Sequence, residues 1–249
     1  MKYKNIKILL GSLIMALFVF GASAGAVSAA TTSNTAKNAA KITEFKAKAD
    51  QEINRRVVVL NNVISTANNM KKISDTDKAS LIAIAQKNID DLTALKTKID
   101  ADVDLATIKT DRAGITKSYR IFMLIVPKIH ILAAADRIEA TTDLMNGVVT
   151  KITAKIATAQ AAGKDVTTLN TVLAEMQAKI ADANTQAEKA KTAVLTLVPD
   201  NGDKTAMTAN GAALKTGKGF IKAGQDDLKV SRTDVETIRT GLKALGFNL

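Results

Sequence analysis

The stretch Val166–Val194, VTTLNTVLAEMQAKIADANTQAEKAKTAV, decides the fold class of this chain. Its apolar side chains recur every three or four residues, at Val166, Leu169, Leu173, Met176, Ile180, Ala183, Ala187 and Val194. That spacing places them on one face of an α-helix. Similar spacing runs through residues 53–67 and 81–99. The sequence therefore predicts an all-α protein, an elongated antiparallel helical bundle of about five helices with coiled-coil-like hairpins.

The composition agrees with this fold class. The 249 residues include 35 basic and 24 acidic side chains but no cysteine, no tryptophan and only two prolines. Long Ala-rich helices fit this usage better than a β-sandwich, which would need more aromatic residues and more Gly/Pro turns. Without cysteine there are no disulfides, so stability must come from packing.

The first thirty residues have the three-part layout of a secretory signal peptide. Lys2, Lys4 and Lys7 precede an apolar run over residues 8–20, and small residues fill 21–30. We expect a signal peptide over residues 1–30, cleaved after Ala29 or Ala30, and therefore export to the cell envelope or the medium. Retention of the leader as a single membrane anchor is the alternative.

The rest of the chain divides by its hydrophobic pattern. We expect a flexible tether over residues 31–40, a helical bundle over 41–198, a loop with a weakly helical Gly-containing segment over 199–225, and a C-terminal helix over 226–249 that packs on the bundle. Ser74, Asp104 and Asp165 are predicted N-caps. A long third helix over 105–162, closed by Gly163, is predicted to kink at Pro127.

The most apolar part of the mature chain, residues 121–135, supports two hypotheses. It is either the buried centre of the core or an element that inserts into a membrane. Its candidate residues are Ile121, Phe122, Met123, Leu124, Ile125, Val126, Pro127, Ile129, Ile131 and Leu132. A membrane-spanning helix needs about 20 apolar residues, and Pro127 and Lys128 interrupt this tract, so the core is favoured.

No pattern in the sequence predicts catalysis, a cofactor or a metal site. His130 is the only histidine and lies within the apolar tract, where it is expected to be a buried core side chain. The stretch GAALKTGKG at 211–219 has five residues where a phosphate-binding loop has four, and Gly219 replaces the hydroxyl residue. We therefore predict that the protein is not an enzyme.

The basic excess bears on the choice of partner. It allows weak binding to an anionic surface, but no aromatic side chains interleave with the lysines, so specific nucleic-acid recognition is not expected. Three functions follow as hypotheses. The first is a non-enzymatic envelope or secreted protein that binds an unknown protein or envelope polymer, self-associates or acts as a spacer. The second is a pore-forming-like protein that contacts membranes through residues 121–135. The third is a nonspecific binder of polyanions such as extracellular DNA.

One resemblance covers roughly residues 41–162. The segments SYRIF at 118–122, IVP at 125–127 and IHILAAADRI at 129–138 resemble a stretch of uncharacterised exported helical proteins predicted from uncultivated, small-genome bacteria. DTDKASL at 75–81 and LTALK at 92–96 are similar to the same group. The resemblance implies no activity. It implies only that the apolar tract belongs to a recurring helical hairpin.

Overall fold

The computed structural model describes residues 28–200 and 202–248, with the backbone alone at 28–35 and 116–121. Most of the predicted signal peptide, residues 1–27, lies outside this range. The expected cleavage positions Ala29 and Ala30 fall at the start of the first described helix.

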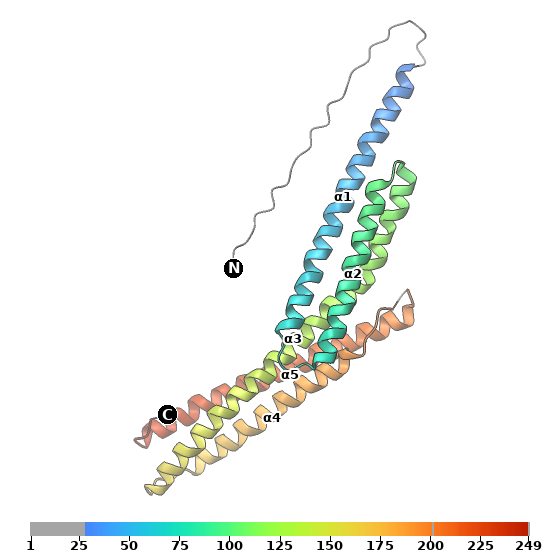
Figure 1. The fold of residues 1–249 in the computed structure, drawn as a ribbon. Helices are drawn as coiled ribbons and strands as arrows, with labels where there is room; N and C mark the ends of the chain where they lie inside the picture. Colours follow the sequence, from blue (N-terminus) through green and yellow to red (C-terminus); the bar gives the residue numbers. More distant parts are fainter. Residues whose placement is uncertain (1–27, 201, 249) are drawn as a thin grey trace, which may run out of the picture. The chain divides into compact units, whose positions relative to one another are not determined.

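The all-α prediction is confirmed. The described residues form five helices and no strand: α1 (Ser28–Asn69), α2 (Asp75–Ala101), α3 (Leu105–Ala161), α4 (Thr167–Leu195) and α5 (Lys204–Ala244) (Figure 1). The chain divides into two units, residues 1–40 and 41–249.

The segment 31–40, expected to be an irregular tether, is helical and belongs to α1. Its side chains from 36 to 40 are exposed. The segment contains neither proline nor glycine, so nothing in it prevents a helix. The exposure of residues 36–40 agrees with the missing apolar period, because hydrophobic periodicity reports burial rather than helicity.

The helix boundaries follow the predicted capping chemistry. The Ser74 hydroxyl accepts a hydrogen bond from the Asp77 amide, and the Asp104 carboxylate accepts from the amides of Ala106 and Thr107. Asp165 accepts from the Thr167 amide, although Val166 is the cap residue itself. The α3 helix ends before Gly163, whose φ of 74° closes a Schellman turn.

Three helices form what we call the first helical region: α1 from Lys41, α2, and α3 up to residue 121. Two ion pairs between helices show that neighbours run antiparallel: Lys96 Nζ lies 2.6 Å from Asp50 Oδ1, and Lys98 Nζ lies 2.8 Å from Asp111 Oδ1. Large aliphatic side chains fill the interior between the helices: Ile53, Leu60, Leu81, Leu92, Ile99 and Ile108.

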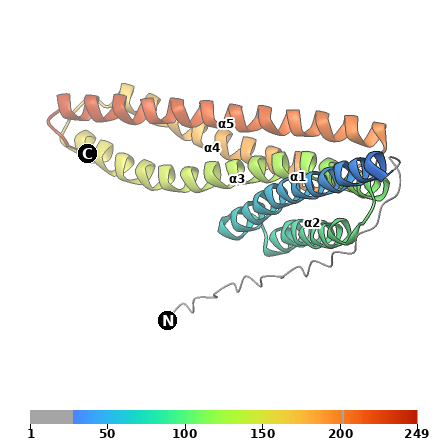
Figure 2. The same ribbon diagram turned by 90° about the horizontal axis from the view of Figure 1, so that it is seen from above.

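The second helical region comprises α3 from residue 122, α4 and α5. Figures 1 and 2 both show these helices side by side. The α3 helix continues through Pro127 without ending, and its two halves pack against different helices, α2 on one side and α4 with α5 on the other. The kink expected at Pro127 stays a prediction.

The C-terminal part of the chain differs from expectation. Residues 204–225 are not weakly helical but form the first half of the continuous α5 helix. Two glycines of this segment are buried where helices meet. A Cβ on Gly217 would lie 3.0 Å from Val194 Cγ1, and one on Gly224 would lie 3.2 Å from the Ala183 carbonyl oxygen. These glycines permit close helix packing, which offsets their low helix propensity.

Candidate functional site at the junction along α3

The apolar tract lies where the two helical regions meet. Its buried residues are Leu124, Ile125, Ile129, Ile131 and Leu132, while Phe122, Val126 and Pro127 are half-buried. Met123 is 54% exposed, and the side chain of Ile121 lies outside the described residues. In this structure the tract therefore packs inside the protein along most of its length.

His130 is exposed, so its expected burial as a core side chain is wrong. It belongs to a line of exposed residues that recur every seven positions along α3: Met123, His130, Arg137, Leu144 and Lys151. A heptad interval keeps residues on one side of a helix. The tract is thus buried on most of its circumference but keeps one side in solvent.

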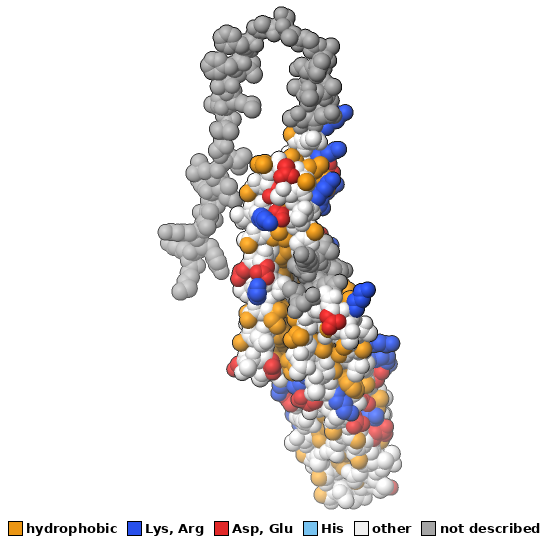
Figure 3. Space-filling view, turned by 90° about the vertical axis from the view of Figure 1, so that its right-hand side faces the viewer, with side chains coloured by type: hydrophobic (Ala, Val, Ile, Leu, Met, Phe, Trp, Pro, Cys, Tyr) orange, Lys and Arg blue, Asp and Glu red, His pale blue; other side chains and the backbone are white. Residues whose placement is uncertain are grey.

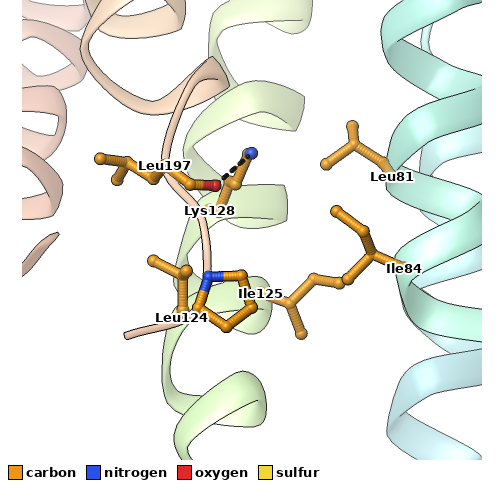
Figure 4. A pocket seen from close by; sticks show the side chains of 7 residues that line it. Leu81, Ile84, Leu124, Ile125, Lys128 and Leu197 are labelled. Carbon is orange, nitrogen blue, oxygen red and sulfur yellow. Dashed lines mark hydrogen bonds between the residues drawn. The ribbon is translucent and has the colours of Figure 1, made fainter. Parts of the chain in front are cut away.

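Lys128 is a buried cation within the apolar tract, only 5% exposed. Its Nζ donates to the carbonyl oxygen of Leu195 at 2.7 Å and to that of Leu197 at 3.0 Å; Figure 4 shows the bond to Leu197. These carbonyls lie at the end of α4, where a helix leaves acceptors unsatisfied and its dipole favours a positive charge. Burial lowers the pKa of Lys128, and Asp77 opposes that effect. Lys128 therefore fixes the end of α4 against α3.

A small hollow lies beside Lys128. Leu81 and Ile84 of α2 face Leu124 and Ile125 of α3 across it, as Figure 4 shows. Its volume is about 10 Å³. That is room for roughly one water molecule, which needs about 10–15 Å³ and several polar partners. The hollow is too small for a substrate or an organic cofactor.

Asp136 holds the turn between α1 and α2. Its Oδ1 accepts hydrogen bonds from the backbone amides of Lys71 and Lys72, the first at 2.7 Å. The Lys72 side chain in turn pairs with Asp143, further along α3. A buried carboxylate that accepts two amide bonds is a strong, directional contact. Asp136 therefore attaches the end of α1 to α3.

A second buried cluster joins α3 to α4. Lys191 Nζ lies 2.6 Å from Glu139 Oε1 and 2.9 Å from Glu188 Oε1. Burial, opposed by Lys191 and reinforced by Glu188, raises the pKa of Glu139 to about 7. Burial lowers the pKa of Lys191, but the two glutamates outweigh it and the net direction is upward. This cluster links the helices, and we expect their contact to depend on pH near neutrality because Glu139 then changes charge.

The side chains of Lys128, Asp136, Glu139 and Lys191 contact a helix end, a turn or one another. A larger hollow of about 410 Å³ between α3 and α4 is lined by Asp143 and mainly by uncharged polar side chains such as Thr142, Asn146, Gln177 and Asn184. Within the part of the chain that the structure describes, no cluster of three or more metal-ligating side chains occurs. No helix among those residues is long and apolar enough to cross a bilayer.

Much of the exposed charge is paired along single helices. Examples are Lys48 with Glu44 and Lys87 with Asp91, each four residues apart. Figure 3 shows basic and acidic side chains mixed over the face that it draws. Such exposed pairs contribute only about 0.2–1 kcal/mol each.

Sequence reasoning missed the polar residues of the junction. Lys128 was detectable, because a lysine inside an apolar tract must reach a partner or solvent. The cluster of Glu139, Glu188 and Lys191 gave no signal, because charged residues up to 52 positions apart look like ordinary surface residues in a sequence. The contact between Asp136 and the turn after α1 was hidden for the same reason.

The comparisons with known proteins add no relative. No protein-family model, no curated protein and no solved structure matches this chain.

Proposed function

We propose that the protein is a non-enzymatic, exported helical scaffold that binds a partner at the cell envelope or in the medium, or serves there as a spacer. One observation supports this most: the buried charged groups of the junction bind other helices. Lys128 binds the end of α4, Asp136 binds the turn after α1, and Glu139 pairs with Lys191. Groups used in this way hold a scaffold together, because each of them is engaged by another helix or by a turn.

The N-terminal pattern supports the exported location. A basic stretch, an apolar run and small residues up to Ala30 are the features that a signal peptidase recognises. The packing of Ile125, Ile129 and Leu132 inside the protein favours the scaffold over the membrane-active alternative, in which this tract would leave the core.

Two measurements test the proposal. The full chain is expressed in a bacterial host, and cytoplasm, envelope and medium are separated. We expect the chain in the envelope or medium, with an N-terminus directly after Ala29 or Ala30. Unprocessed chain confined to the cytoplasm would contradict export.

The second measurement is leakage of a trapped dye from vesicles of zwitterionic and anionic lipid. We expect the processed protein to cause no leakage at near-physiological salt. Leakage that persists at that salt and disappears in Met123→Asp, a change at a 54% exposed position of the tract, would favour the membrane-active alternative instead.

A further inference from the structure

A row of basic side chains follows one flank of α5. Its members, all exposed, are Lys215, Lys218, Lys222, Lys229, Arg232, Arg239 and Lys243. The opposite flank meets α4: Asp227 Oδ1 lies 3.1 Å from Lys179 Nζ, and the Phe220 ring centre lies 6.0 Å from Lys189 Nζ. With 3.6 residues per turn, the basic row falls on the other side of the buried stripe, toward α3.

A second, shorter row lies on α3. Arg137, Lys151 and Lys155 are exposed on the flank away from Glu139, whose Oε1 contacts Lys191 of α4 at 2.6 Å. The α3 and α5 helices run parallel and in close contact, because Ile131 lies against Gly217 and Ile138 lies against Gly224. The two rows therefore border the same side of the α3/α5 pair. We call the ten basic residues of both rows the α3–α5 basic face.

The charge of this face is largely uncompensated. Asp226 pairs with Lys222 at 2.6 Å, and Glu236 pairs with Arg239 at 2.6 Å. Among the described residues, no ion pair is formed by the other eight basic side chains of the face. Ten basic and two acidic residues give a local excess of eight, while the whole chain has a net charge of +11. Most of the basic excess is thus gathered on one side of one helix pair.

The shape and chemistry of the face indicate the kind of partner. From Lys215 to Lys243 the α5 row extends about 42 Å at 1.5 Å per residue. A narrow line of cations suits a linear chain of anions, because each contact releases condensed counterions without reading any sequence. Two large apolar side chains, Met123 and Leu144, are exposed on the same side of α3, at 54% and 74%. A bilayer surface would need more apolar contact for stable binding.

We propose that the α3–α5 basic face binds a linear polymer with a phosphodiester backbone. This inference deepens the proposed function, since it assigns the binding surface and the chemistry of the partner. Lysine and arginine would contact the phosphates. Binding would be electrostatic and would not depend on the chemical groups that separate one phosphate from the next.

The test compares two charge-matched variants of the full chain. The face variant changes Lys215, Lys218, Lys229 and Arg232 to Gln. The control variant changes Lys41, Lys71, Lys109 and Lys164 to Gln, all exposed and outside the face. Both lose four positive charges at solvent-exposed sites, so both are expected to keep the wild-type circular dichroism. Binding is measured by fluorescence anisotropy over a range of NaCl concentrations from low to above physiological, with labelled poly(glycerol phosphate) and a single-stranded oligonucleotide of equal charge as probes.

We expect wild type to bind both probes, with an affinity that falls linearly on a log–log plot against salt. The face variant should bind at least about 10-fold more weakly at low salt. The slope of log affinity against log salt concentration should become shallower by roughly 3, because each of the four lost phosphate contacts contributes about 0.7. The control should change by less than about 2-fold, because its four positions lie outside the contact surface. Equal losses in both variants would overturn the proposal, because they would reflect net charge alone.

Two further outcomes separate this inference from the proposed function. Binding to vesicles of anionic lipid but to neither polymer would overturn the inference in favour of a membrane partner. If the face variant is still exported and retained in the envelope like wild type, while wild type binds neither polymer, the scaffold function stands and only this surface assignment fails.

Discussion

The two helical regions use similar three-and-four-residue spacing and both bury alanines among larger aliphatic side chains, but among the described residues the buried glycines lie in the second region. In the first region, large residues such as Leu60, Leu81 and Leu92 fill the space between helices. In the second region, Ala183, Ala187 and Ala190 of α4 lie opposite an α5 stripe that contains Gly217 and Gly224. Small residues let backbones approach closely: a Cβ added to Gly224 would lie only 3.2 Å from the Ala183 carbonyl oxygen.

The comparison separates two kinds of information in a helical sequence. Spacing determines which face of a helix is buried, while side-chain size determines how near the neighbouring helix comes. Polar contacts differ in the same way. The Lys96–Asp50 pair of the first region is about one-third exposed, whereas the Glu139–Lys191 pair of the second is nearly buried. The helix contacts of the second region therefore accommodate a change of side-chain size or charge less easily than those of the first.

The largest effect is expected where the two regions meet. Ile125→Asp places a carboxylate at a site that is 3% exposed and lined by aliphatic side chains and by Lys128, whose ammonium group already binds two backbone carbonyls. It should lower the free energy of unfolding by about 4 kcal/mol or more, enough to abolish the fold of many domains. Met123→Asp, two residues away but 54% exposed, is the control. It should change stability by less than about 1 kcal/mol.

Urea unfolding followed by far-ultraviolet circular dichroism measures both variants. A stable, folded Ile125→Asp protein would show that this tract does not hold the two regions together.

A second substitution breaks the close approach in the second region. Gly224→Leu forces a large side chain against the Ala183 carbonyl and Ile138, and should cost about 3 kcal/mol through overpacking. Gly219→Leu lies on the same helix with nothing within 4 Å of its Cβ position. It should be neutral or stabilise the protein by up to about 1 kcal/mol, because leucine favours helix more than glycine does.

The same urea unfolding assay measures the stability of Gly224→Leu and Gly219→Leu. Equal effects at both glycines would mean that helix propensity, rather than packing distance, governs α5.

The smallest of the three effects is a pH dependence specific to the second region. Because the pKa of Glu139 is raised to about 7 in the folded protein, the protonated carboxyl is favoured by folding. Its contribution is complete below the ordinary pKa near 4.5 and is lost as the pH rises through about 7. Between about pH 5 and about pH 8 this group should remove about 2 kcal/mol of stability.

Glu139→Gln should flatten the change over that pH range, as measured by urea midpoints at successive pH values. Glu175→Gln is the matched control, since that glutamate is exposed on α4 and is not part of the cluster of Glu139, Glu188 and Lys191. An unchanged pH profile in Glu139→Gln would contradict a titrating role for this carboxyl.

Much of the helical architecture follows from the sequence because it depends on local chemistry. The α4 stripe from Leu169 to Val194 is buried as its spacing predicts, and Ser74 and Asp104 cap the helices that they precede. Gly163 ends α3 because only a residue free to adopt positive φ closes that turn easily. These features depend on residues that are close together in the sequence, so they can be predicted without knowing which distant residues are in contact.

Tertiary structure decided the remainder. The glycines of α5 predict a weak helix from the sequence, but in the structure two of them pack against α4. The exposure of His130 depends on which side of α3 has no neighbouring helix. Lys128, Asp136 and Glu139 acquire their roles from partners that are distant in the sequence, in the last part of α4 and in the turn after α1. The sequence determines helicity and the buried face of each helix through local interactions, whereas the packing of distant helices decides which glycines are contacts and which charges are buried.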